Sequence, residues 1–232
     1  MADFTVVIPT YNERENVEKL VKHFLTMFDK QKLKGELMIV DDDSPDKTWE
    51  VVKKWEKKDP RVRLMHRKGK KGLASAVIDG FEKAKSSTLL VCDADFSHDY
   101  SIIPTMVSLI EKGEDIVVGS RFVEGGGIAG WPARRLLVSR GARLISRIML
   151  GIGVKDPMSG FFALKKSVFE KVKGKLRPQG YKILLEIIVR SGSDKVKEVP
   201  FVFKDRELGK SKLSGKVMGE YLKMVFGLAF SR

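Results

Sequence analysis

The chain has 232 residues, 43% of them hydrophobic and 32% charged, a balance that excludes a mainly disordered chain and a polytopic membrane protein. Its 44 lysines and arginines against 30 aspartates and glutamates give a net charge of +14, which predicts an anionic partner: nucleic acid, an anionic membrane surface or a phosphorylated small molecule. A single cysteine, Cys92, excludes a disulfide framework and a cysteine-based metal cluster.

The first 120 residues alternate short apolar runs with patterns of helical period. Strands are predicted at residues 4–8, 37–40, 62–65, 89–92 and 116–119, and helices at 16–30, 46–58, 72–84 and around Pro104. This alternation predicts an α/β fold with a mostly parallel, doubly wound sheet flanked by helices. Such sheets bind ligands beyond the carboxyl ends of their strands, which here are residues 9–13, 41–43, 93–95 and 120–121.

The pattern after residue 120 is less regular. It predicts a glycine-rich loop at 124–130, a basic helix at 134–150, a turn at 156–160, a short helix from 167, a helix at 182–190, a strand at 196–203, a polar loop at 204–213 and a C-terminal helix. No linker or repeat interrupts the chain, so we expect one domain with a nucleotide half and a second-substrate half.

Two carboxylates, Asp93 and Asp95, flank Ala94 directly after the fourth predicted strand. At a strand end, such a pair can hold a divalent metal and a sugar hydroxyl together, and its hard oxygen ligands suit Mg²⁺ or Mn²⁺. The metal would act as a Lewis acid that stabilises a departing diphosphate. The alternative is an acidic turn that only caps the next helix.

Three further carboxylates, at residues 41–43, follow the second predicted strand and precede Ser44. One of them can accept hydrogen bonds from a ribose or a base, and three adjacent negative charges favour a bound cation. After the first strand, Tyr11 can cover a base and Glu13 can bind a ribose or base edge. For both segments the alternative is helix capping, and neither a Walker nor a dinucleotide glycine motif follows the first strand.

Eight segments occur in a recognisable order: VVIPTYNERENV, IVDDDSPDKTWEV, RKGKKGLASAVIDGF, VCDADFSH, VGSRFVEGG, WPARRLLVSRGA, DPMSGFFALKK and DRELGKSKLS. Together they resemble the dolichyl-phosphate mannose synthases of glycosyltransferase family 2, and the resemblance covers almost the whole chain. It implies a single GT-A domain over residues 1–232. Within it, residues 1–120 would form the nucleotide-sugar half, 121–213 the acceptor and lid half, and 214–232 an amphipathic interface helix.

The resemblance also implies the donor and metal contacts. The guanosine edge would be formed by Pro9, Tyr11, Glu13, Val40 and Asp42. Asp93 and Ala94 match donor-contacting positions, and Asp95 matches the main metal ligand. Ser97 matches the second metal ligand, but it stands where the family often has glutamine, a stronger ligand. The alternatives to direct coordination by Ser97 are an intervening water or help from His98. For His98 itself we expect an ordinary surface imidazole.

The phosphate contacts come from the same resemblance. Arg121 matches a position that touches donor and acceptor phosphates, and Arg135 and Ser139 match acceptor-phosphate positions. Arg206 and Lys212 match a loop that closes over the donor diphosphate, and their polar, basic surroundings suit such a lid. Asp95, Arg121, Arg206 and Lys212 are therefore the expected catalytic group. The alternative for each basic residue is a solvated charge.

The expected reaction is inverting transfer of mannose from GDP-mannose to dolichyl phosphate with Mg²⁺ or Mn²⁺. The acceptor phosphate is anionic near neutral pH, so no strong general base is needed. One alternative is transfer of glucose from UDP-glucose to a polyisoprenyl phosphate. A non-catalytic basic module that binds nucleic acid or membrane is a remote alternative, because such a surface has no use for carboxylates at strand ends. We expect no nucleic-acid partner.

Two helices predict contact with a membrane surface. In the helix at 134–150, Arg140, Arg143 and Arg147 share one side, while the other side carries Leu137, Leu144, Ile145, Ile148 and Met149. The C-terminal helix is apolar nearly all round towards its end. The alternative for both is packing against the sheet. Without a signal peptide or a spanning segment in this sequence, we expect peripheral attachment at the cytoplasmic face, with a membrane-anchoring partner or a missing transmembrane segment as a further possibility.

Overall fold

A computed structural model of the protein describes residues 2–69, 72–177, 183–204 and 215–230. The strands are β1 (Phe4–Thr10), β2 (Gly35–Asp41), β3 (Val62–His66), β4 (Thr88–Val91), β5 (Ile116–Ser120), β6 (Gly127–Ala129), β7 (Phe162–Lys165), β8 (Val196–Pro200) and β9 (Val202–Lys204). The helices are α1 (Arg14–Lys30), α2 (Thr48–Lys58), α3 (Leu73–Lys83), α4 (Ile103–Glu111), α5 (Ala133–Leu150), α6 (Lys166–Val172), α7 (Ile183–Ser191) and α8 (Gly215–Ala229), with short 3₁₀ turns at Tyr100–Ile102 and Lys173–Lys175.

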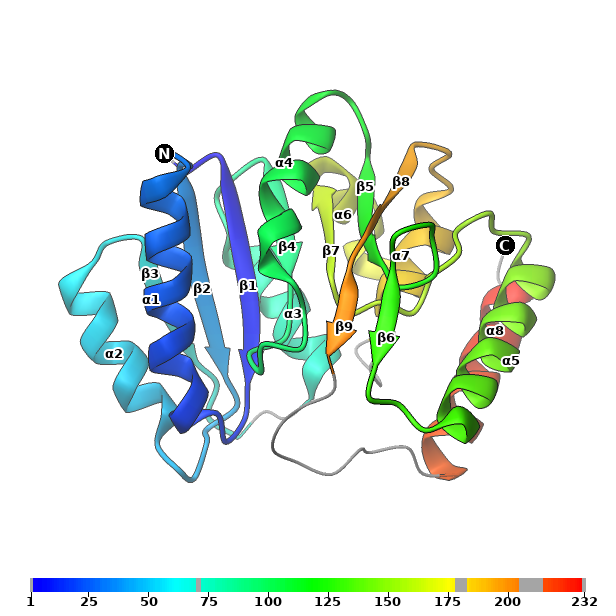
Figure 1. The fold of residues 1–232 in the computed structure, drawn as a ribbon, viewed down its shortest axis with the longest axis horizontal. Coiled ribbons are helices and arrows are strands. Elements are labelled where there is room, and N and C mark those ends of the chain that lie inside the picture. The colour runs from blue at the N-terminus through cyan, green and yellow to red at the C-terminus, as the bar shows by residue number, and fades with distance from the viewer. Residues whose placement is uncertain (1, 70–71, 178–182, 205–214, 231–232) are drawn as a thin grey trace.

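A seven-stranded sheet with the order β3-β2-β1-β4-β7-β5-β8 forms the centre of the molecule (Figure 1). Strands β1 to β5 and β8 run parallel, and β7 runs antiparallel between β4 and β5. The expected mostly parallel α/β sheet is therefore confirmed. A second, two-stranded sheet pairs β6 with β9.

Helices cover both faces of the large sheet because each carries an apolar stripe at helical spacing. On one face, α1, α2 and α4 bury residues such as Leu20, Phe24 and Met106. On the other face, α3, α6 and α7 bury a second cluster around Phe81. Gly80 brings α3 close to β1, because a Cβ atom at this position would lie 2.5 Å from Val7 Cγ1. The sheet is thus buried on both faces, and its loops are left to form the site.

The second half of the chain departs from the predicted elements in three places. The strand expected at 196–203 is two strands in different sheets, because Pro200 has no N–H to donate and ends β8 before the chain crosses to β9. The loop expected at 124–130 contains β6. Strand β7 was missed, since a four-residue apolar run is too short to assign by periodicity alone.

Helices α5 and α8 pack side by side beyond one end of the sheet (Figure 1). Their shared core contains Ala142, Leu150, Tyr221 and Val225, and the Tyr221 hydroxyl donates a hydrogen bond to the Ala142 carbonyl. Among the described residues, no helix is long and apolar enough to cross a membrane.

Candidate active site

The predicted site segments lie along one edge of the large sheet. Parallel strands β1, β2, β4 and β5 end there, at the lower edge in Figure 1, and each is followed by one of the polar segments. The antiparallel strand β7 begins at the same edge, so the loop before it, residues 156–161, joins the site as well. The fold therefore brings together segments that are far apart along the chain, such as 9–13 and 156–161.

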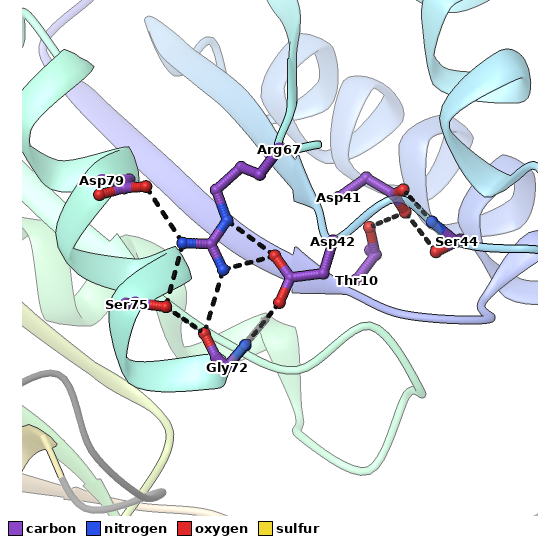
Figure 2. A network of polar contacts seen from close by, with 8 residues as sticks. All are labelled: Thr10, Asp41, Asp42, Ser44, Arg67, Gly72, Ser75 and Asp79. Atoms are coloured by element: carbon purple, nitrogen blue, oxygen red, sulfur yellow. Dashed lines mark hydrogen bonds and ion pairs between the residues drawn. The ribbon is translucent and has the colours of Figure 1, made fainter. Parts of the chain in front are cut away.

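Asp41, at the end of β2, is fully buried and joins the ends of β1 and β2 (Figure 2). Its carboxylate accepts hydrogen bonds from Thr10 Oγ1 at 2.8 Å and from the Ser44 hydroxyl and backbone N–H at 2.7 and 2.9 Å. A buried carboxylate needs such donors to offset its lost hydration. Asp41 therefore has a structural role in shaping the loop that carries Asp42.

Asp42 is held by Arg67, which directly follows β3 (Figure 2). Arg67 Nε and Nη2 donate to one carboxylate oxygen at 2.7 and 2.5 Å, and the Gly72 N–H donates to the other at 2.8 Å. Arg67 also donates to Ser75 and Asp79 on α3. The buried Arg67 side chain thus ties the end of β2 to the start of α3.

This network corrects the argument for a bound cation at the three adjacent carboxylates. The chain itself supplies partners for two of them: the Arg67 guanidinium for Asp42, and the His66 imidazole, whose Nε2 lies 2.6 Å from Asp43 Oδ1. Sequence reasoning missed Arg67, although its position directly after a parallel strand was an available signal. The expected contact between Asp42 and a nucleoside stays a prediction.

The loop after β1 keeps its candidate side chains near solvent. Tyr11 is 43% exposed, and Glu13 accepts a hydrogen bond from the Asn16 side chain at 2.8 Å. Pro9 pairs with Val40 across the parallel strands, but the Val40 side chain lies fully in the core. Any contact of Val40 with a nucleoside would therefore use its backbone. The guanosine contacts predicted for this loop remain untested.

The residues after β4 form a tightly bonded loop around the two candidate carboxylates. Asp95 Oδ1 accepts the Ser97 N–H at 3.0 Å. The Asp93 N–H donates to His98 Nδ1 at 3.1 Å, and the Tyr100 hydroxyl donates to the Asp93 carbonyl at 2.6 Å. Ala94 is buried between the two half-exposed carboxylates. The loop therefore fixes the backbone on which both carboxylates are carried.

The expectation that His98 is a surface imidazole is wrong. The residue is buried, and its ring stacks on Phe161 with centroids 4.9 Å apart and an interplanar angle of 13°. Burial lowers the pKa of His98, because a charged imidazolium would lose its hydration there. The apolar cage comes from residues distant in sequence, which explains why the local pattern did not reveal it.

The residues after β4 fit a divalent metal that receives a few ligands from the protein and the rest from water and phosphate oxygens. Within the described part of the chain, no group of three or more His, Cys, Asp or Glu side chains could hold a metal ion. The hydroxyl of Ser97, however, is buried without a hydrogen-bond partner among the described residues, two positions after Asp95. Two carboxylates and a hydroxyl suit Mg²⁺ or Mn²⁺, which complete their shells with water and phosphate oxygens.

Arg121, after β5, is held by the fully buried Asp156. Its Nε and Nη2 atoms donate to the two carboxylate oxygens at 2.8 Å each, and its backbone N–H donates at 3.1 Å. Asp156 in turn is fixed because the side chain of Glu198 accepts the N–H groups of residues 155 and 156. Arg121 is therefore positioned by the protein, and sequence reasoning missed Asp156 as the partner of this candidate side chain.

Trp131 brings the two candidate phosphate-binding arginines together. The guanidinium carbon of Arg135 lies 3.7 Å from the centroid of the Trp131 ring, and that of Arg121 lies 5.7 Å from it. Ser139 lies one turn further along α5, partly exposed. Arg206 and Lys212 lie outside the described residues.

The sequence profile described as Glycosyl transferase family 2 matches residues 5–173. The chain belongs to glycosyl transferase family 2. Family 2 relatives include a dolichol-phosphate mannosyltransferase of Pyrococcus furiosus, 46% identical over 97% of this chain, and one of Mycosarcoma maydis, 35% identical over 97%. A polyprenol monophosphomannose synthase of Mycolicibacterium smegmatis is 36% identical over 93%. The matches cover 63%, 78% and 82% of these relatives, so this chain spans less than two thirds of the first.

Solved structures confirm the GT-A fold expected for family 2. The glucosyl-3-phosphoglycerate synthase of Mycobacterium tuberculosis, in complex with Mn²⁺, UDP and glucosyl-3-phosphoglycerate, superposes with a TM-score of 0.69. It is 17% identical, and the match covers 99% of this chain and 79% of that one. A second structure of that enzyme, with Mn²⁺, UDP-glucose and phosphoglyceric acid, gives the same score, identity and coverage. At this identity the likeness establishes the architecture.

Proposed function

We propose that this chain is an inverting glycosyltransferase that moves mannose from GDP-mannose to dolichyl or another polyprenyl phosphate. The observation that carries the proposal is that the Asp93 and Asp95 carboxylates and Arg121 follow strands that end at the same side of the sheet, where Arg121 and Arg135 share the Trp131 ring. Carboxylates suit a metal-bound diphosphate, and paired arginines suit a phosphate acceptor. The names of the relatives that are 35–46% identical support the same donor sugar and acceptor class.

The charges of the two substrates determine what the protein's residues must do. The acceptor is a phosphate monoester whose second pKa is about 6, so it is an anionic nucleophile near neutral pH without help from a base. The protein must instead bring two anions together and exclude water. Arg121 and Arg135 would orient the acceptor phosphate, and the two hydrogen bonds to Asp156 hold the Arg121 guanidinium in place. We assign Arg206 and Lys212 to the donor diphosphate on the resemblance alone.

We also propose that transfer depends on Mg²⁺ or Mn²⁺. Asp95, with Asp93 and Ser97 beside it, would hold the ion. When bound, the ion neutralises charge that develops on the departing nucleoside diphosphate. The buried Ser97 hydroxyl, which lacks a partner among the described residues, supports an additional ligand or a bound water at this position.

We further propose that α5 and α8 rest on a membrane surface. On α5, Leu137, Leu144 and Ile148 are 71%, 57% and 73% exposed, while the opposite side of the helix packs on α8. Arg140 and Arg147 are exposed along one border of this apolar stripe. Phe226 on α8 and Phe230 directly after it add exposed rings. An apolar face bordered by arginines suits an anionic lipid interface, whereas helices packed against the sheet would have buried these side chains.

The attachment would be peripheral, and its cytoplasmic side remains a prediction from the sequence. A partner subunit or a transmembrane segment outside this sequence would be compatible with the same surface. Met149, expected on the exposed stripe, is partly buried against the α5–α8 core instead.

One transfer assay in detergent tests the proposal. Dolichyl phosphate is supplied with labelled GDP-mannose or UDP-glucose, each with Mg²⁺, Mn²⁺ or EDTA. We expect label in the lipid from GDP-mannose only, and none with EDTA. Label from UDP-glucose would contradict the donor assignment and leave the fold and acceptor class intact. No transfer from either donor, with GDP binding intact by calorimetry, would contradict the proposed function.

A further inference from the structure

The peptide groups of Asp93 are held by side chains where strand pairing has stopped. The ladders that join β4 to β1 and β7 end at Val91. Two residues later, the Asp93 N–H donates to His98 Nδ1 and the Asp93 carbonyl accepts from the Tyr100 hydroxyl. The backbone that carries both candidate carboxylates therefore depends on the loop that follows it.

The hydrogen bond from Asp93 also determines the tautomer of His98. A backbone N–H is always a donor, so Nδ1 must be the unprotonated acceptor and the ring proton must lie on Nε2. This places the Nε2–H edge towards the Asp93 carboxylate, with Nε2 3.8 Å from Oδ2. That distance is too long for a direct hydrogen bond, but the polar edge still faces the negative charge.

The imidazole is held between aromatic rings from two other segments, the loop before β7 and the β8–β9 stretch. Besides Phe161, the rings of Phe201 and Phe203 have centroids 5.5 and 5.9 Å from the His98 ring. The carbonyl of the preceding residue, Ser97, accepts the Lys204 N–H at 3.1 Å. The loop after β4 is thus fastened to β9, and His98 has little freedom to turn away from Asp93.

We propose that His98 is a positioning residue for the metal and donor site, whose Nδ1 accepts the hydrogen bond that fixes the Asp93 backbone. This inference rests on the proposed function, which assigns Asp93 and Asp95 to the metal-bound donor. In this role His98 touches neither metal nor substrate. It sets the position from which Asp93 and Asp95 approach them. A ring that only filled space could be replaced by any side chain of similar size.

A matched pair of substitutions tests the role of the acceptor atom. Asparagine can place its Oδ1 near the position of Nδ1, whereas the carbonyl of glutamine reaches the position of Nε2. Both variants lose the aromatic stacking. We therefore expect His98→Asn and His98→Gln to lower the thermal midpoint similarly. The Mn²⁺ concentration that half-saturates GDP binding should stay within about threefold of wild type in His98→Asn and rise about tenfold or more in His98→Gln.

Equal half-saturating Mn²⁺ concentrations in the two variants would overturn the proposal, because the acceptor would then be irrelevant. A second measurement covers the case in which neither variant folds. ¹⁵N NMR of the wild-type chain labelled with ¹⁵N-histidine should show that His98 is unprotonated at Nδ1 and protonated at Nε2. A proton on Nδ1 would overturn the proposal.

The same experiments separate this inference from the proposed function. If wild-type protein binds GDP with Mn²⁺ but transfers no mannose, the proposed reaction fails while the Asn/Gln comparison still decides the role of His98. If mannose is transferred and the two variants behave alike, the reaction stands and the positioning role fails.

Discussion

The proposed donor side and the proposed acceptor side of the site are built in different ways. On the donor side, the carboxylates after β2 find partners within the chain: Asp41 with Thr10 and Ser44, and Asp42 with Arg67. On the acceptor side, α5 exposes both Arg140 and the apolar residues Leu144 and Ile148. The first region is preorganised by its own contacts, and the second presents surface that suits a lipid. Substitutions should therefore affect folding and metal binding in one region, and lipid use in the other.

The largest effect is expected from Asp95→Ala. Removing the main candidate metal ligand should lower the transfer rate by at least about a hundredfold, because the leaving diphosphate loses its neutralising ion. The rate and its Mn²⁺ dependence are measured together, with thermal unfolding as the control for folding. Near-normal turnover would remove Asp95 from the metal site.

Arg67→Ala tests whether the donor side is held by internal pairing. The Arg67 side chain is only 2% exposed, so its loss leaves Asp42 without its buried cation and should lower the free energy of unfolding by about 3–5 kcal/mol. Asp79→Asn is the control: its contact with Arg67 lies at a more exposed position and should cost about 1 kcal/mol or less. Urea unfolding measures both. A loss below about 1 kcal/mol for Arg67→Ala would show that the network in Figure 2 is not needed for stability.

Arg135→Ala should separate the two substrates. Loss of a charged donor to the acceptor phosphate should raise the apparent KM for dolichyl phosphate about tenfold or more, while GDP affinity stays within about twofold. Arg140→Ala, an exposed arginine on the same helix, is the matched control and should change only binding to anionic vesicles. An unchanged acceptor KM in Arg135→Ala would exclude Arg135 from the acceptor site.

The exposed stripe of α5 should matter for membranes and not for folding. Replacing Leu144 and Ile148 together by serine should weaken co-sedimentation with anionic liposomes about tenfold, because two apolar side chains no longer enter the interface. A Leu144→Met, Ile148→Leu variant preserves the apolar surface and should bind like wild type. The free energy of unfolding should stay within about 0.5 kcal/mol in both. Unchanged liposome binding by the serine variant would contradict the membrane assignment.

The sequence predicted the regular parts of this molecule well, because they follow local periodicity. The five strands and the helices of the first 120 residues, and the strand-end carboxylates at residues 93 and 95, lie where the pattern places them. The parts that were missed depend on long-range contacts: β7 inserted antiparallel, and His98 buried by distant phenylalanines. Asp156 pairs with an arginine 35 residues earlier, which no local pattern reveals.

The smallest effects are expected from replacing one tyrosine in each region by phenylalanine, and these two substitutions compare the regions directly. Tyr100 donates its hydroxyl to the Asp93 carbonyl, and Tyr221 donates its own to the Ala142 carbonyl in the α5–α8 core. Either phenylalanine substitution removes the hydroxyl's hydrogen bonding and keeps the ring, so each should cost about 1 kcal/mol of unfolding free energy. Tyr100→Phe should also raise the Mn²⁺ concentration that half-saturates GDP binding by a few-fold. The reason is that Tyr100, unlike Tyr221, bonds to the backbone of the candidate metal loop. If Tyr221→Phe shifted the Mn²⁺ requirement as much, the two regions would be coupled, and the separation between a preorganised donor side and an independent lipid side would be wrong.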